Sequence, residues 1–137
     1  MDQEPDTEGV KAVVRGKDGK FLLMKRAEQK DEYPGYWEFP GGGLEDETPE
    51  EGVLRELEEE TGIRAEATGE KGSFTWHSEF TDREIKSHSF LVEVEKTEVE
   101  PSREHTRYEW LELEEIFEKK HFPDIKKDLK HAGVQID

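Results

Sequence analysis

GGGLEDETPEEGVLRELEEETGI, residues 41–63, contains three glycines, a helix start and a dense run of glutamates. Thr48 and Glu51 have the spacing of a capping box, and the proline between them suits the first turn of a helix. Gly62 is typical of the left-handed residue that ends a helix. The sequence therefore predicts a helix that runs from about Pro49 to Thr61.

This helix is predicted to have an apolar face and an acidic face. At 100° per residue one side collects Val53, Leu54, Leu57 and Thr61. Glu56, Glu59 and Glu60 are spaced i,i+3 and i,i+4, so we expect their carboxylates to converge on the opposite side. Like charges at these spacings repel, and a divalent cation would reverse the sign of that interaction. Hard oxygen ligands of this kind suit Mg²⁺, with Mn²⁺ as the alternative.

The glycines before the helix offer a close approach to a ligand. Gly41 and Gly42 carry no Cβ, so their backbone can come near a bound molecule. Gly52 lies one turn before Glu56 on the same side and leaves space above the acidic patch. The stretch thus combines oxygen ligands with an accessible backbone.

Nine of these residues resemble the sequence box of the Nudix hydrolases. The box G-x5-E-x7-R-E-U-x-E-E-x-G-U, with U aliphatic, is matched by Gly41, Glu47, Arg55, Glu56, Leu57, Glu59, Glu60, Gly62 and Ile63. The alternative is a solvated acidic helix face, which would not require Arg55 and both glycines in register. The loop after Pro40 is one residue shorter than in many members of the family, so the sequence leaves open which glycine carbonyl faces a metal.

The resemblance implies an α/β fold, the Nudix α/β/α sandwich with a mixed β-sheet between helices. It also implies a metal-dependent hydrolase that cleaves the phosphoanhydride bond of a nucleoside diphosphate linked to another moiety. The Gly41 carbonyl, Glu56, Glu59 and Glu60 would then be metal ligands. By the same resemblance Arg55 orients a catalytic glutamate, and Glu47 is the expected partner that fixes Arg55.

A loop glutamate completes the catalytic residues that the resemblance implies. In some mutator-type relatives a glutamate six residues before a tryptophan binds metal or acts as general base, and Glu104 precedes Trp110 by six. A solvated loop carboxylate is the alternative for Glu104, and Glu79, Glu84 or a box glutamate could be the base instead. The expected catalytic set is Arg55, Glu56, Glu59, Glu60 and Glu104.

Two short motifs suggest substrates. WEFPGG, residues 37–42, resembles mutator-type members that convert nucleoside triphosphates, some of them oxidised, to monophosphate and pyrophosphate. SREHTRYEWL, residues 102–111, resembles a stretch of the dinucleoside polyphosphate hydrolases. That subfamily has a tyrosine downstream of the box, and in this chain Phe80 lies near the corresponding position. The expected substrate contacts are Arg26, Gly41, Gly42 and Phe80, with a plain surface charge as the alternative for Arg26. ADP-ribose is disfavoured as a substrate, because the proline found downstream of the box in ADP-ribose hydrolases is missing here. A catalytically silent module that only binds nucleotide is also an alternative, but the intact box carboxylates argue against it.

Composition restricts the partners. The 137 residues suit one domain, expected at 8–137 after a loose tail at 1–7. A formal charge of −16 argues against nucleic-acid binding and repels polyphosphates at long range, so local cations must oppose it. The chain has no cysteine, membrane span or signal-peptide core, which favours a cytoplasmic protein acting on a small nucleotide. Whether it forms a homodimer cannot be read from the sequence.

The remaining elements follow from apolar runs and turn signals. Strands are expected at 10–14, 21–26, 37–39, 64–72 with a closing turn, 73–80, 84–95 and 107–113, a loop at 97–106, and short helices at 114–120 and 123–132. The first two strands should form a hairpin around an Asp-Gly turn. The run Phe90–Val94 suggests a strand covered on both faces. Trp37 or Phe39 should pack in the core. His77 and His88 lack metal-ligand spacing and are expected to be ordinary hydrogen-bonded residues.

Overall fold

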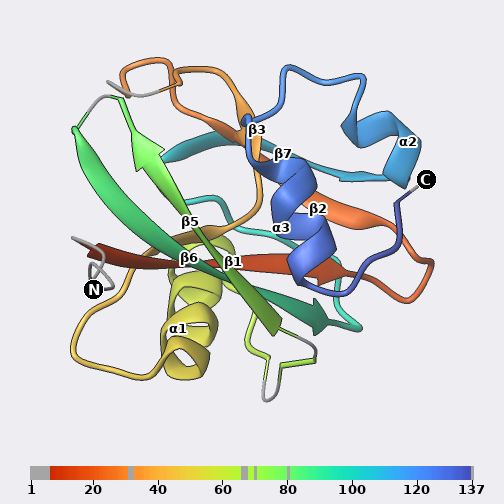
Figure 1. Cartoon of the computed structure of the whole chain (residues 1–137). Coiled ribbons are helices and arrows are strands. Elements are labelled where there is room, and N and C mark those ends of the chain that lie inside the picture. The colour runs from red at the N-terminus through yellow and green to blue at the C-terminus, as the bar shows by residue number, and fades with distance from the viewer. Residues whose placement is uncertain (1–6, 31–32, 66–67, 70, 80, 137) are drawn as a thin grey trace.

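The computed structural model describes residues 7–30, 33–65, 68–69, 71–79 and 81–136. Its elements are β1 (Thr7–Arg15), β2 (Phe21–Arg26), β3 (Trp37–Glu38), β4 (Gly41–Gly43), α1 (Pro49–Thr61), β5 (Lys71–Ser78), β6 (Arg83–Glu93), β7 (His105–Leu111), α2 (Leu113–Ile116) and α3 (Ile125–His131). Figure 1 shows the sheet with α1 on one side and α3 on the other. The expected mixed sheet between helices is confirmed.

Each face of the sheet has its own hydrophobic core. Alternate residues of β1 and β6 pack with α1, in a cluster that includes Val10, Ala12, Val14, Val53, Leu57, Phe90 and Val92. Residues on the other face pack with α2 and α3, in a cluster that includes Val13, Leu23, Trp37, Phe39, Ile116, Ile125 and Leu129. Leu91 packs against this second cluster. The prediction of a strand covered on both faces is therefore confirmed, as is core packing for Trp37 and Phe39.

The sheet opens between its first two strands. β1 runs parallel to β6 along its whole length, from Thr7 opposite Ile85 to Arg15 opposite Glu93. With β2 it shares a single register pair, Arg15 opposite Phe21. Farther from the turn β1 pairs with β4, and β2 pairs with β3 and β7. The expected hairpin is thus closed only at its turn, and its open end leaves a gap.

The helix α1 begins and ends where the sequence predicts. The Glu51 N–H donates to Thr48 Oγ1 at 3.2 Å, and the Thr48 N–H donates to the Glu51 carboxylate at 3.0 Å, which completes the capping box. Gly62 has φ 77°, and its N–H donates to the Glu58 carbonyl at 2.8 Å. These caps define the ends of the helix that carries the box glutamates.

Several predicted boundaries are wrong. Thr7 belongs to β1 rather than to a tail, and the other tail residues lie outside the described part of the chain. Residues 64–65 and 68–69 are not a strand, and the register between β5 and β6 begins with Lys71 opposite Phe90. β6 ends at Glu93, and β7 begins at His105 and ends at Leu111.

The last helices are shorter than predicted. α2 ends at Ile116 because the following segment turns toward β3, where the Trp37 N–H donates to the Lys120 carbonyl at 2.8 Å. The Phe122 N–H in turn donates to the Trp37 carbonyl at 2.7 Å. α3 ends before Gly133, whose φ is 87°.

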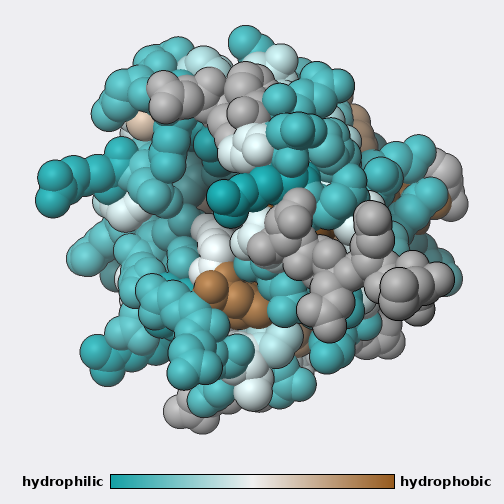
Figure 2. All heavy atoms as spheres, turned by 60° about the vertical axis from the view of Figure 1, so that its left-hand side comes forward, coloured by the Kyte–Doolittle hydropathy of each residue, from teal (hydrophilic) through white to brown (hydrophobic). Residues whose placement is uncertain are grey.

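The surface is largely hydrophilic. On the face shown in Figure 2 hydrophilic residues dominate, and hydrophobic ones form a small patch near the middle. Within the described residues, no helix has both the length and the apolar character that crossing a membrane requires.

Candidate active site

A groove of about 310 Å³ lies at the open end of the gap between β1 and β2. Five residues that the sequence predicted for the site line it: Arg26, Gly41, Gly42, Glu60 and Glu104. They come from β2, β4, α1 and the loop before β7, so the fold brings distant segments together here. Phe80, the remaining predicted substrate contact, lies outside the described residues.

Glu60 connects the box helix to the glycine loop. Its Oε2 accepts a hydrogen bond from the Gly41 N–H at 2.9 Å. The residue is 3% exposed. Burial raises the pKa of Glu60 well above its ordinary value, and Glu38 and Glu56 add to the increase, although Lys11 and the Gly41 N–H oppose it.

The prediction that Glu60 lies on the face opposite the core is wrong. Seven residues make nearly two helical turns, so Glu60 lies only about 20° around the helix from Val53. Val53 is fully buried in the core. Glu60 therefore faces the groove at the edge of the buried side, whereas Glu59 is exposed.

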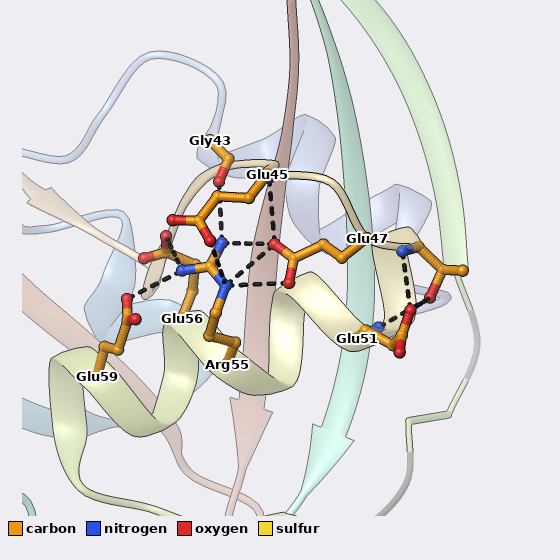
Figure 3. Close-up of polar contacts among 8 residues, drawn as sticks. Gly43, Glu45, Glu47, Glu51, Arg55, Glu56 and Glu59 are labelled. Atoms are coloured by element: carbon orange, nitrogen blue, oxygen red, sulfur yellow. Dashed lines mark hydrogen bonds and ion pairs between the residues drawn. The ribbon is translucent and has the colours of Figure 1, made fainter.

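Arg55 brings Glu56 and Glu59 together (Figure 3). Its Nη1 donates to Glu56 Oε1 and to Glu59 Oε2, at 3.0 Å in both cases. Its Nη2 donates to the Gly43 carbonyl at 3.2 Å. One guanidinium thus joins two box carboxylates to the backbone of the glycine loop.

Glu47 fixes this guanidinium, as expected. Arg55 Nε donates to both carboxylate oxygens of Glu47 at 3.0 Å, and Nη2 donates to Oε1 at 2.6 Å. Hydrogen bonding from Arg55 holds the pKa of Glu47 below its ordinary value. The same contact is the largest of those that raise the pKa of Arg55. The pair stays charged and keeps Arg55 in a single orientation.

Glu56 packs against the second glycine of the loop. A Cβ built on Gly42 would meet the Glu56 carboxyl carbon at 2.6 Å. Burial raises the pKa of Glu56, hydrogen bonding and charge from Arg55 oppose this, and the charges of Glu59 and Glu104 add to it. The absence of a side chain at Gly42 is therefore what allows the carboxyl to lie against the loop.

The three box glutamates have different partners. Glu56 and Glu59 contact Arg55, whereas Glu60 contacts the Gly41 N–H, and Glu56 lies close enough to Glu60 for its charge to raise the Glu60 pKa. Among the described residues no three His, Cys, Asp or Glu side chains are close enough to hold a metal ion as they stand. The cations differ accordingly, because Arg55 contacts Glu56 and Glu59 while Lys11 is the cation that acts on Glu60.

Glu104 lies beside Glu60 in the groove. Lys30 Nζ is 3.2 Å from Glu104 Oε1. Partial burial raises the pKa of Glu104, but Lys30 and a hydrogen bond from the Glu60 carboxyl outweigh it, so the pKa falls below its ordinary value. The loop is anchored to α1, because the Ser102 N–H donates to the Glu60 carbonyl at 3.2 Å.

Two of the alternative bases lie elsewhere. Glu79 and Glu84 belong to the β5–β6 hairpin and do not line the groove. Glu84 is 2.9 Å from His77 Nδ1. His88 Nε2 likewise contacts Glu8 at 2.9 Å. Both histidines therefore have carboxylate partners, which confirms the expectation that they are ordinary hydrogen-bonded residues.

A buried ionic network forms one wall of the groove. Glu38, 5% exposed, receives hydrogen bonds from Lys11 Nζ at 2.8 Å and from Arg26 Nη1 at 2.9 Å. His105 Nε2 is 3.0 Å from the same carboxylate. Burial alone would raise the pKa of Glu38, but Lys11, His105 and Arg26 together lower it. The carboxylate stays ionised and holds three strands together.

A second buried acid lies on α3. Asp128 is 3% exposed and accepts a hydrogen bond from Ser89 Oγ at 3.1 Å. Burial raises the pKa of Asp128 to about 7, although Lys11 and Ser89 lower it, and Asp124 and Glu38 raise it further. Asp128 lines the same groove.

No role was predicted from the sequence for Lys11, Lys30, Glu38, His105 or Asp128. One signal was available for Lys11, a charged residue inside the apolar strand sequence GVKAVV, because buried lysines are almost always paired. Glu38 lies within the quoted WEFPGG. For His105 and Asp128 no local pattern distinguishes them from surface residues, since only the tertiary fold buries them.

The groove is acidic in spite of its cations. Its charged lining consists of three basic side chains, Lys11, Arg26 and Lys30, and six carboxyl groups, Glu8, Glu38, Glu60, Glu104, Asp124 and Asp128. A polyphosphate would be repelled from this lining unless cations came with it. Carboxylate and backbone oxygens are the ligands that Mg²⁺ and Mn²⁺ prefer, so the residues present fit a divalent metal.

Comparisons with known proteins identify a family and several relatives. The family model described as NUDIX domain matches residues 5–132. A MutT-like protein of Streptomyces ambofaciens is 40% identical over 111 residues, which are 80% of this chain and 66% of that protein. An 8-oxo-dGTP diphosphatase of Proteus vulgaris is 44% identical over 88 residues, 64% of this chain and 76% of that one.

A solved structure extends the similarity to nearly the whole chain. The crystal structure of a MutT protein from Methanosarcina mazei Go1 has a TM-score of 0.78 and 33% sequence identity. The match covers 93% of this chain and 92% of the other.

Proposed function

Because this chain belongs to the Nudix hydrolase family, we propose that it cleaves a nucleoside triphosphate, normal or modified, to a monophosphate and pyrophosphate with the help of Mg²⁺. The observation that carries the proposal is the hydrogen bond from the Gly41 N–H to Glu60. It joins a box glutamate to the glycine loop at the groove. The printed names of the Streptomyces and Proteus relatives favour the triphosphate as substrate.

The metal ligands would come from α1, the glycine loop and the loop before β7. Glu56, Glu59, Glu60 and Glu104 supply carboxylates, and the Gly41 carbonyl supplies a backbone oxygen. When bound, Mg²⁺ would screen the phosphate charges and activate water for attack. Mn²⁺ has the same preference for oxygen ligands and is the alternative ion.

The side chains around the groove would bind and orient the substrate. Arg26 and Lys30 line the groove and carry the charge that phosphate oxygens attract. Trp76 and Phe122 line it too and provide aromatic surface for a nucleobase. These contacts support a nucleotide rather than inorganic pyrophosphate as substrate.

Glu104 is the proposed general base. Its pKa is lowered, so it is ionised at neutral pH and can accept a proton from water. Arg55 would orient Glu56 and Glu59, because it donates to both while Glu47 holds it. Positioning and electrostatic stabilisation would contribute most of the remaining rate acceleration.

An assay over a panel of nucleotides tests the proposal. The panel contains normal and oxidised nucleoside triphosphates, dinucleoside polyphosphates and ADP-ribose, each with Mg²⁺, with Mn²⁺ and with a chelator. We expect pyrophosphate release from a triphosphate that stops when the metal is removed. Preference for a dinucleoside polyphosphate would contradict the proposed substrate, and no hydrolysis of any compound would indicate a nucleotide-binding module.

A further inference from the structure

The Glu38 carboxylate collects donors from three strands at the groove wall. Oε1 accepts from Lys11 of β1 at 2.8 Å, and Oε2 accepts from Arg26 of β2 at 2.9 Å. The third contact is His105 Nε2 of β7, 3.0 Å from Oε2, in the tautomer whose Nε2 carries the proton. Since β1 and β2 share one register pair at their other end, Glu38 holds the two strands together at the groove.

A β-bulge directs His105 toward this carboxylate. Lys25 pairs with Arg107, but the next residue, Arg26, pairs with His105. Thr106 is therefore an extra residue in β7, and an extra residue turns the side chains beyond it to the other face of the strand. His105 is buried, whereas Thr106 and Arg107 are exposed.

Packing alone does not explain a histidine at this position. Nδ1 of His105 is buried without a hydrogen-bond partner, and it is the one such side-chain atom found among the described residues. An unpaired buried nitrogen destabilises the folded state, and a phenylalanine of similar shape would avoid that cost. What a histidine contributes here is therefore the Nε2 donor to Glu38.

His105 also adjoins the proposed general base. The Glu104 carbonyl accepts a hydrogen bond from the Ala27 N–H at 2.9 Å, and Ala27 directly follows Arg26. Two contacts therefore connect the segments Arg26–Ala27 and Glu104–His105. One is this backbone hydrogen bond, and the other is the Glu38 carboxylate, which both Arg26 and His105 contact. Arg26 and Glu104 both line the groove.

We propose that His105 is a positioning residue that, through Glu38, fixes the guanidinium of Arg26 relative to the carboxylate of Glu104. It touches no substrate itself. The inference rests on the proposed function, in which Arg26 contacts a phosphate and Glu104 takes a proton from water. In that reaction the distance between the two groups sets how the phosphate chain lies against the base.

The test compares His105→Phe with His105→Gln, whose amide N–H₂ can still donate to Glu38. The measurements are kcat and KM for the triphosphate at saturating Mg²⁺, the Kd for a non-hydrolysable triphosphate analogue, and the Tm. His77→Phe is the matched control, because it removes another histidine–carboxylate contact away from the groove.

We expect His105→Phe to lower kcat about tenfold and to weaken analogue binding about threefold, because the Arg26 guanidinium is no longer held in a fixed position relative to the Glu104 carboxylate. Its Tm should change little, because the loss of the Nε2 donor to the buried Glu38 carboxylate destabilises the fold while the removal of the unpaired Nδ1 offsets that loss. His105→Gln should recover most of kcat, and His77→Phe should match the wild-type kcat.

Other outcomes overturn the inference. A His105→Phe variant with wild-type kcat and Kd excludes a positioning role. Phenylalanine and glutamine variants that lose kcat and Tm in parallel identify His105 as a packing residue. A wild-type protein that binds the analogue without hydrolysing any nucleotide contradicts the proposed function, while Kd still tests His105. A wild-type protein that neither binds nor hydrolyses contradicts both.

Discussion

Glu60 accepts a hydrogen bond from the backbone N–H of Gly41 at 2.9 Å, which links the box helix to the glycine loop inside the groove. The contact spans nineteen positions of sequence. The burial of Val53 and Leu57 in the core orients α1 so that Glu60 faces the groove. The proposed chemistry depends on this link, since it brings an acidic helix side chain to the loop backbone.

Replacing Glu60 with glutamine should lower turnover at least about a hundredfold, because it removes a ligand charge from the proposed metal site. The fold should persist, since an amide oxygen can still accept from Gly41. Glu59→Gln should show a loss of similar size. Steady-state kinetics with circular dichroism as a check on folding measure this.

Glu58→Gln is the matched control, because Glu58 is on the same helix, is exposed and pairs with Arg64. It should keep wild-type turnover. Near-normal turnover in either box variant would exclude that residue from the mechanism.

Gly42→Ala should displace the Glu56 carboxyl with little effect on stability. The added Cβ would come within 2.6 Å of the end of a flexible side chain, which can move aside. We therefore expect about a tenfold loss of turnover with the Tm nearly unchanged. Gly43→Ala is the control, because a Cβ there meets nothing within 4 Å. Equal turnover in the two variants would contradict the role given to Glu56.

Glu104→Gln should lower turnover less than the Glu60 substitution does, by about tenfold or somewhat more, if Glu104 is the general base. The amide can still accept from Lys30, so the loop should keep its place. Glu98→Gln, in the same loop and exposed, provides the comparison. An unchanged rate for Glu104→Gln would move the base to another residue.

Stability should depend on pH through Asp128. Its pKa is about 7 in the folded state, above its ordinary value of 3.8, so the folded protein holds this proton more tightly than the unfolded chain. The stabilisation is complete below the unfolded pKa and is lost as the pH rises through 7. Lys11, Asp124 and Glu38 are the other charged groups that act on it.

Asp128→Asn removes this titration. Between pH 5 and pH 8 its unfolding free energy should rise relative to the wild type by about 2–3 kcal/mol, since one pKa unit is about 1.4 kcal/mol. Chemical denaturation at the two pH values measures the difference, and exposed Asp46→Asn serves as the control. A difference that does not vary with pH would show that Asp128 titrates normally.

The local elements could be predicted, but not how they meet. The capping box and Gly62 define α1 because helix ends depend on neighbouring residues. Helical periodicity also predicted correctly that Val53 and Leu57 lie in the core. It predicted wrongly that Glu60 lies on the opposite, exposed face, because a residue on the boundary between two helix faces is buried or exposed according to what packs against it.

Long-range contacts account for the rest. The gap between β1 and β2 exists because β4, β3 and β7 compete for their edges, and no single strand sequence reveals such competition. His105 turns inward only because of a bulge in β7. Lys11 and Glu38 are hydrogen-bonded across 27 positions, so their buried pairing becomes visible only in three dimensions.

The most direct test of the account is a titration of Mg²⁺ into wild-type protein and Glu60→Gln during hydrolysis of a nucleoside triphosphate. Wild type should release pyrophosphate only with metal, and the variant should remain at least about a hundredfold slower at saturating Mg²⁺. Hydrolysis that persists in a chelator, or a variant as fast as wild type, would contradict the claim that Glu60 and the Gly41 loop form a metal-dependent active site.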